Sequence, residues 1–355
     1  MIKKKRLSEF FPMIRMREEI SAEIEGNPKL KEKFGEFSRE EQKRFIDMCA
    51  GERGVKILYD AFFKEIMNPD SAPGRMSSLL SVLLGREVKV VKTLPPEDRI
   101  ADEKSLLVMD IVVQTEDGEL INCEVQKIGY KFVGERASCY SADLLLRQYK
   151  RIRDENKDKA KDKRKTFNYK DIKDVYTIVF LEKSQGVFHE YWKEKQAIQE
   201  EAPLVHRFKQ ESDTGIELGL LQNFVFIPLD IFGEIYQNKP IDTNLAAWLM
   251  FLSTDEPERI LELVEKHPEF KPLYEDLYNL CRNAERVMEM FSKELQELDR
   301  NTVDFMIDEY RQEIAQKDQM LEEKDQMLEE KDQMIGQKEE EINQLREMLK
   351  RYQGK

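Results

Sequence analysis

The chain of 355 residues contains little cysteine, histidine or tryptophan, with four, three and two residues respectively. Its cysteines are scattered without a CxxC spacing, which predicts no zinc site and is typical of reduced thiols inside a cell. The histidines are too widely spaced to predict a catalytic triad, and no GxSxG or P-loop motif accompanies them. These absences exclude the common signatures of zinc sites, serine hydrolases and P-loop enzymes.

Long apolar runs are also missing from the sequence. The closest candidate, residues 245–252, is far shorter than the roughly 18 apolar residues of a membrane-spanning helix. The basic residues 1–6 precede an apolar stretch at 10–14, but Arg15 interrupts that stretch before a signal-peptide core can form. We therefore expect a cytoplasmic protein without a membrane partner.

Positive charge is scarce overall, because 58 Lys and Arg residues stand against 71 Asp and Glu residues and give a net charge of −13. Such a chain has no general attraction for polyanions, so a contact with nucleic acid would need a local basic segment. Residues 147–173 form one, with twelve basic and five acidic residues. A solvated linker is the alternative interpretation of this segment.

A hydrophobic content of 40% is sufficient for a substantial core. Strands are predicted near residues 88–91, 174–182, 204–208 and 221–229, and helices at 55–67, 74–84 and 134–153. This pattern predicts an α/β fold with a mixed central β-sheet flanked by helices. The predicted organisation is a helical segment at 1–50, a central domain at 51–235, a helical domain at 236–300 and a heptad-repeat coiled coil at 301–355.

Residues 105–127 carry the most informative pattern. Two runs rich in Val, Ile and Leu, at 106–113 and 120–125, flank a Thr-Glu-Asp-Gly stretch, and Asp-Gly between such runs predicts an antiparallel hairpin. A turn centred on residue 117 places Asp110 opposite Glu124. Because side chains alternate along a strand, Glu124 and Gln126 share one face with Asn122.

Asp110 interrupts an otherwise apolar run, where an unpaired buried charge would be costly. Two adjacent carboxylates repel each other unless a cation lies between them, and hard oxygen ligands suit Mg²⁺ or Mn²⁺. Asp110 and Glu124 therefore predict a divalent-metal site. The alternative is that Glu124 is a surface residue on a one-sided strand, because acidic pairs arise by chance in a chain with 36% charged residues.

The order of Asp110, a hairpin, Glu124-x-Gln126 and a following helix resembles the PD-(D/E)xK nuclease superfamily, and more narrowly its nuclease family transposases. The resemblance covers roughly residues 55–230, including the stretches 60–64 and 139–150. It implies a restriction-endonuclease-like core in which Asp110 and Glu124 bind metal and Gln126, in place of the usual Lys, orients water or phosphate.

The resemblance also implies supporting residues. On the predicted helix after the hairpin, Arg136, Tyr140 and Gln148 share a face, which would place Arg136 near a phosphate and Tyr140 beside the site. The alternative is that Arg136 forms a surface ion pair and Tyr140 belongs to the core. The family pattern places an acid where this chain has Gly74, so Asp60 or Glu65 would have to substitute, unless each is an ordinary solvated helix residue.

Basic residues beside a nuclease-like site suit nonspecific contacts with the phosphate backbone of DNA. The candidates in the basic segment are Lys150, Arg151, Arg153, Lys163, Arg164 and Lys165.

Beyond residue 300, Ile and Leu recur every seven residues from Ile314 to Leu349, which predicts a left-handed coiled coil and a homodimer through the C-terminal helix. The second heptad position is Lys or Asp until Leu345, so the coiled coil would be marginal, and a single helix packed on the body is the alternative.

These observations favour a Mg²⁺-dependent DNA endonuclease associated with recombination or mobile elements. A catalytically weak DNA-binding or assembly protein that retains the nuclease fold is the alternative, and the absence of an acid at Gly74 favours it.

Overall fold

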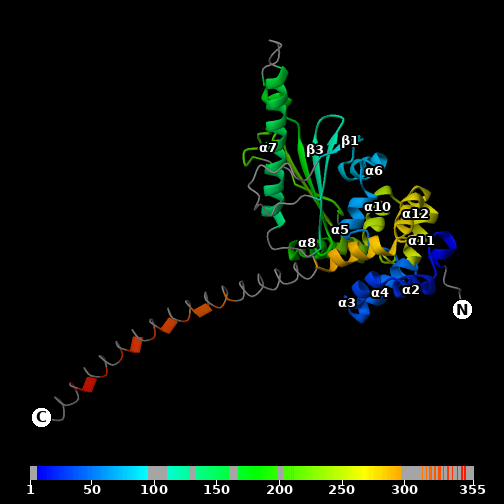
Figure 1. Ribbon diagram of the computed structural model, residues 1–355. Helices are drawn as coiled ribbons and strands as arrows, with labels where there is room; N and C mark the ends of the chain where they lie inside the picture. Colours follow the sequence, from blue (N-terminus) through cyan, green and yellow to red (C-terminus); the bar gives the residue numbers. More distant parts are fainter. Residues whose placement is uncertain are drawn as a thin grey trace. The chain divides into compact units, whose positions relative to one another are not determined.

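Apolar runs rich in Val, Ile and Phe form a single six-stranded sheet with the order β1-β2-β3-β4-β6-β5 (Figure 1). The computed structural model describes residues 6–94, 110–127, 133–159, 167–198, 203–208, 210 and 212–296, and single positions between 314 and 348. The strands are β1 (Val90–Leu94), β2 (Ile111–Thr115), β3 (Leu120–Gln126), β4 (Val175–Leu181), β5 (His206–Phe208) and β6 (Gln222–Pro228).

The sheet is mixed. Strands β3, β4 and β6 run parallel to one another, whereas β1 and β2 form an antiparallel end and β5 pairs antiparallel with β6. Helices cover both faces, which confirms the predicted α/β class with a mixed, helix-flanked sheet. Their bounds are α1 (Leu7–Phe10), α2 (Arg17–Gly26), α3 (Pro28–Glu36), α4 (Arg39–Cys49), α5 (Asp60–Ile66), α6 (Pro73–Leu84), α7 (Val133–Lys159), α8 (Gly186–Ala197), α9 (Leu229–Ile235), α10 (Asn244–Ser253), α11 (Pro257–Lys266) and α12 (Lys271–Leu280).

The predicted hairpin is formed by β2 and β3. Its register pairs Ile111 with Cys123 and Val113 with Ile121. The turn closes through a 3.0 Å hydrogen bond from the Gly118 amide to the Thr115 carbonyl, and Gly118 adopts a φ of 86°, which a side chain disfavours. Residues 106–109 of the first predicted run lie outside the described residues.

Helix α7 packs on one face of the sheet and contacts β3, β4 and β6 (Figure 1). Its Tyr140 and Leu144 side chains are buried against Val112, Leu120 and Val175. Helices α5, α6 and α10 contribute to the core on the opposite face. Strand β3 is therefore covered on both sides, so the alternative that Glu124 lies on an exposed strand face is wrong.

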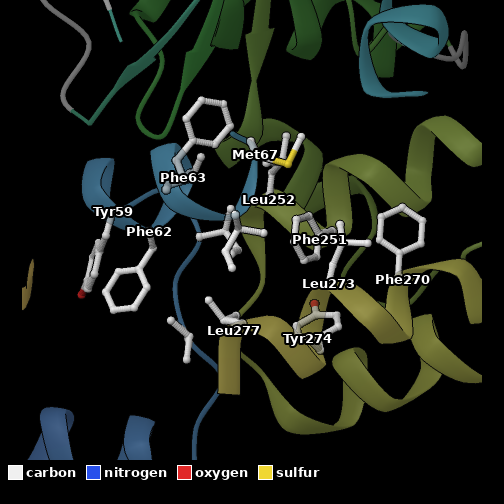
Figure 2. Close-up of a cluster of buried hydrophobic side chains, with 14 of the residues drawn as sticks. Tyr59, Phe62, Phe63, Met67, Phe251, Leu252, Phe270, Leu273, Tyr274 and Leu277 are labelled. Atoms are coloured by element: carbon white, nitrogen blue, oxygen red, sulfur yellow. The ribbon is translucent and has the colours of Figure 1, made fainter. Parts of the chain in front are cut away.

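One apolar core joins segments that are far apart in the sequence. Figure 2 shows Phe62 and Phe63 of α5 in the same cluster as Phe251 of α10 and Tyr274 of α12, and all four side chains are fully buried. The N-terminal helices join this core through Phe45, whose ring centroid lies 5.8 Å from that of Phe291. Ser38 and Glu41 form a capping box at the start of α4.

Several predicted bounds differ from those observed. Helix α5 starts at Asp60 rather than at residue 55, and the amide of the preceding Gly54 donates a 2.7 Å hydrogen bond to the Asp255 carbonyl. This long-range bond holds the chain before α5 out of the helical path. Helix α7 extends to Lys159, beyond the predicted end at residue 153. In the helical domain predicted at 236–300, α12 ends at Leu280 and a further helix covers residues 284–296.

The chain divides into two compact units, Met1–Leu298 and Asp299–Lys355. In the second unit, the described positions are helical and their apolar side chains are exposed, including Leu321 and Leu328 at 56% and 57%. The predicted coiled coil, like the finer division at residues 50, 235 and 300, stays a prediction. Within the described part of the chain, no helix is both long and apolar enough to cross a membrane.

Candidate active site

The candidate site lies at the edge of the sheet where the parallel strands end. Strand β3 ends at Gln126, beside the ends of β4 at Leu181 and β6 at Pro228. Because β2 runs antiparallel to β3, Asp110 at the start of β2 reaches the same edge. Carboxyl edges of parallel strands are the usual location of ligand sites in open α/β sheets.

Asp110 and Glu124 are held together by the hairpin. The Asp110 amide donates a 3.1 Å hydrogen bond to Glu124 Oε1, and the Val125 amide donates a 2.8 Å hydrogen bond to Asp110 Oδ2. Each carboxylate is thus fixed by the backbone of the opposite strand. The observed register therefore brings Asp110 and Glu124 together, as the position of the turn predicts.

Glu124 is 2% exposed and lies on the face of β3 covered by α7. Asn122, two residues earlier on the same face, donates a 2.9 Å hydrogen bond from Nδ2 to Glu124 Oε1. Oε1 therefore accepts from both the Asp110 backbone and the Asn122 amide. Asn122 was not among the predicted site residues, although the strand alternation placed it on the same face.

The electrostatics of the pair favour a nearby cation. Burial, with the charge of Asp110, raises the pKa of Glu124 to about 8. Burial, with the charge of Asp60, raises the pKa of Asp110 to about 6. Two acids whose ionisation is suppressed by burial and mutual repulsion will ionise more readily when a cation shares their site.

Lys64 and Asp60 extend the site from the neighbouring helix α5. Lys64 Nζ lies 2.9 Å from Asp60 Oδ2 and 3.3 Å from Asp110 Oδ1, so its ammonium group bridges the two carboxylates. Burial alone would lower the pKa of Lys64, but the charges of Asp110 and Asp60 outweigh it and raise that pKa. Asp60 Oδ1 is buried and makes no hydrogen bond within the described structure.

The structure separates the two predicted substitutes for the acid missing at Gly74. Asp60 lies beside Asp110, whereas Glu65 forms a 2.7 Å ion pair with Arg286 in which both side chains are largely exposed. Gly74 lies in the first turn of α6, and no atom of the described residues is within 4 Å of its Cβ position. Asp60 is therefore the carboxylate of this pair that α5 brings to Asp110.

Gln126 is 3% exposed, and neither its side-chain oxygen nor its nitrogen has a hydrogen-bond partner among the described residues. An unsatisfied buried amide costs free energy unless a ligand or water completes it. A buried Gln with both polar atoms unsatisfied beside two acids is a group suited to binding a ligand.

The next residue, Lys127, forms a buried ion pair with Glu294 on the helix at 284–296, with side-chain exposures of 5% and 4%. The other carboxylate oxygen of Glu294 accepts a 3.1 Å hydrogen bond from the Asp60 amide at the start of α5. Glu294 thus connects the end of β3 to the helix that carries Asp60 and Lys64. No local sequence pattern could identify this residue, because it acts across 234 residues of chain.

The residues predicted on α7 are divided between the two ends of the sheet. Arg136 Nε donates a 2.8 Å hydrogen bond to the hydroxyl of Tyr140, and the charge of Arg136 partly opposes the rise that burial causes in the pKa of Glu124, so both lie near the acids. Gln148 accepts a hydrogen bond from the Lys173 amide, before β4 begins, and is therefore at the opposite edge of the sheet.

The predicted DNA-contacting residues that the structure describes lie on the later part of α7. Lys150 is exposed, and Arg151 and Arg153 are half-buried. Lys163, Arg164 and Lys165 lie outside the described residues. Among the residues with described positions, no group of three His, Cys, Asp or Glu side chains is arranged to hold a metal ion.

The comparisons with known proteins give one match. The family model of the PD-(D/E)XK nuclease family transposases matches residues 58–304. This range includes Asp60, Asp110, Glu124 and Gln126, and it extends beyond residue 230, where the resemblance in the sequence ended, to include Glu294. No curated protein and no solved structure matches the chain. Since the match covers most of its length, the chain belongs to the PD-(D/E)XK nuclease family transposases, a family with a nuclease role in mobile elements.

Proposed function

We propose that the protein is a metal-dependent DNA endonuclease that hydrolyses phosphodiester bonds, with Asp110 and Glu124 as ligands of Mg²⁺ or Mn²⁺. The observation that carries the proposal is the hairpin pair of carboxylates, with Glu124 buried and Asp110 half-buried, held by a 3.1 Å and a 2.8 Å backbone hydrogen bond with the pKa of both acids raised. Such a pair is costly to fold and is explained by a cation that binds there.

The chemistry of the donors fits a hard divalent cation. Besides the two carboxylates, the site offers Asp60 Oδ1 and the amide oxygen of Gln126, both buried and unsatisfied among the described residues. Mg²⁺ commonly binds one or two protein carboxylates and takes its other ligands from water and substrate phosphate, so three protein acids are not required. When bound, the metal supplies Lewis-acid activation of water and stabilises charge on the phosphate.

The side chains around the acids have separate roles in this proposal. Gln126 positions the attacking water or a phosphate oxygen, because its amide can both accept and donate hydrogen bonds. Arg136 holds a phosphate oxygen near Glu124, with its guanidinium oriented by the Tyr140 hydroxyl 2.8 Å from Nε. Lys64 limits the repulsion between Asp60 and Asp110 before a metal binds.

Binding of DNA is assigned to the later part of α7 and the basic segment after it, through Lys150, Arg151, Arg153, Lys163, Arg164 and Lys165. Since the whole chain carries a net charge of −13, affinity for DNA must come from such a local surface. Contacts from Lys and Arg to phosphates give affinity that depends on salt but not on base sequence.

A second candidate function is a catalytically weak DNA-binding or assembly protein that retains the nuclease fold. Gly74 supplies no acid to the site, and Lys64 occupies the space between Asp60 and Asp110. Both observations would weaken metal affinity.

Cleavage of supercoiled plasmid in Mg²⁺ or Mn²⁺ tests the proposal. We expect nicking by the wild type and a loss of at least about a hundredfold in Asp110→Asn, because removal of one charged ligand disrupts metal binding. Glu65→Gln is the matched control, because Glu65 lies on α5 but pairs with Arg286 away from the acids. DNA binding without cleavage in either metal would transfer the assignment to the second candidate.

We also propose that the protein is a homodimer formed through its C-terminal helix. The exposed apolar positions Ile314, Leu321, Leu328 and Ile335 repeat every seven residues, which is the spacing of a coiled-coil seam. A second copy of the same helix would bury them.

A further inference from the structure

Three aromatic side chains form a cluster at the end of the sheet away from the acids. Tyr149 projects from α7, while Phe167 and Tyr169 belong to the segment that leads into β4. Phe167 packs edge-to-face on both tyrosines, with ring centroids 5.3 Å from Tyr149 and 5.0 Å from Tyr169. The two tyrosine rings lie 6.4 Å apart and nearly parallel, at 17°. We call these three residues the aromatic platform.

The platform includes a ring that is largely exposed. Tyr169 is 73% exposed, the largest exposure among the aromatic side chains that the structure describes. The segment is already attached to the body by buried Ile172 and by the Lys173 amide, which donates a hydrogen bond to Gln148. Anchoring therefore does not explain the position of the Tyr169 ring.

One cation contacts the platform, and further basic residues are close to it in the sequence. The Arg153 guanidinium lies 5.5 Å from the centre of the Tyr149 ring, and Lys150, Lys170 and Lys173 are exposed nearby in the sequence. The acids of the same stretches are Asp154, 3.6 Å from Arg153, and Asp171 and Asp174. Aromatic faces beside Lys and Arg are the combination that binds single-stranded nucleic acid, because bases stack on the rings while cations contact the backbone.

We propose that the aromatic platform binds unpaired bases of a DNA strand, with Tyr169 as the stacking residue. This inference rests on the proposed function for its ligand, and it specifies a substrate class: DNA with single-stranded regions rather than uninterrupted duplex. Nine residues of α7 separate Tyr140 from Tyr149, about 14 Å along the helix axis. At 3.6 residues per turn these nine residues make about two and a half turns, so Tyr149 leaves α7 on the side opposite Tyr140 and the platform is a site separate from the acids.

Fluorescence anisotropy with a labelled oligo-dT strand and a labelled blunt hairpin duplex, in EDTA to prevent cleavage, tests the proposal. Loss of a stacked base costs roughly 1–3 kcal/mol, so we expect Tyr169→Ala to weaken oligo-dT binding by about 5- to 150-fold and duplex binding by less than about twofold. Tyr169→Phe should retain wild-type affinity. The matched control is Tyr191→Ala on α8, because Tyr191 is 37% exposed with Lys195 5.7 Å from its ring centre.

The salt dependence of binding distinguishes base stacking from ionic contacts. The Tyr169→Ala loss should persist as salt rises, whereas the loss in Lys150→Gln should shrink, because only ionic contacts are screened. A Tyr169→Trp variant reports base stacking directly, because stacked bases should quench the fluorescence of the introduced tryptophan. The tryptophan of Tyr191→Trp should show no such quenching.

Equal effects of Tyr169→Ala and Tyr191→Ala, or unquenched fluorescence in Tyr169→Trp under saturating oligo-dT, would overturn the proposal. Both measurements are independent of cleavage, so the proposal for the platform and the proposal for the nuclease site are tested separately.

Discussion

At the scale of single residues, burial of the Glu124 carboxyl group makes the stability of the protein depend on pH. The pKa of this group is raised from its ordinary value of 4.5 to about 8. Between these two pH values the folded protein keeps a proton that the unfolded chain has already released. The folded state therefore binds more protons in this range, and the free energy of unfolding falls as the pH rises from about 5 to 8.

Replacement of this acid should consequently stabilise the metal-free protein. We expect Glu124→Gln to raise the free energy of unfolding at pH 8 by about 2 kcal/mol, with the difference fading towards pH 5. Gln retains the oxygen that accepts from Asn122 and the Asp110 amide. Urea unfolding in EDTA at both pH values, with Glu65→Gln as the control, measures the effect. A loss of stability that is equal at both pH values would contradict it.

The Lys127–Glu294 pair gives the opposite prediction. Both side chains are about 5% exposed or less, so Lys127→Met leaves the Glu294 charge buried without its ammonium partner. We expect a loss of about 3–5 kcal/mol in the free energy of unfolding, and partial recovery when Glu294→Gln is added. The exposed pair Lys31–Glu25, at 61% and 65%, is the control, and Lys31→Met should cost less than about 1 kcal/mol. Equal losses in the two Lys variants would refute this account.

The contacts of the site that could be predicted are those between residues close together in the sequence. Asp110 opposite Glu124 follows from the Asp-Gly turn, because a hairpin register is set by its turn. The position of Asp60 beside Asp110, and of Glu294 beneath Asp60, depends on how α5 packs against segments more than 100 residues later. No periodicity encodes those contacts, so the sequence offered Asp60 and Glu65 as equals.

At the scale of elements, the turn of the hairpin determines the register that pairs the acids. Gly118 has a φ of 86°, and a β-carbon there would strain the backbone. We expect Gly118→Ala to lower the free energy of unfolding by about 1–2 kcal/mol, measured by urea unfolding. Gly233→Ala is the control, because Gly233 lies inside α9 with open space around its Cβ position, and it should be neutral or stabilising by up to about 1 kcal/mol. Destabilisation by both variants alike would contradict a specific role for the turn.

The bounds of elements were predictable where the signal was local. Helix α6 ends at Gly85 in the left-handed conformation, as a C-terminal glycine predicts, and β4 and β6 match their apolar runs within about one residue. Helix α5 was predicted too long, because the bond from Gly54 to the Asp255 carbonyl is a tertiary contact. The break after α12 likewise carries no Gly or Pro signal.

At the scale of the whole molecule, the heptad positions predict how copies associate. Leu321 and Leu328 occupy one seam position, and Lys324 and Lys331 occupy its partner position. We expect a concentration-dependent dimer in light scattering of the full chain, a monomer in Leu321→Lys/Leu328→Lys, and a tighter dimer in Lys324→Leu/Lys331→Leu. A monomeric wild type at all accessible concentrations, unchanged by the leucine substitutions, would refute the dimer.

The contact of Glu294 with the Asp60 amide also governs when the site can form during biosynthesis. At about 5–20 residues per second, a ribosome needs roughly 10–50 s to translate the chain between these two residues. Through that interval the nascent polypeptide carries both hairpin acids but lacks the residue that fixes α5 beside them. The complete candidate site can therefore form only after Glu294 has been translated.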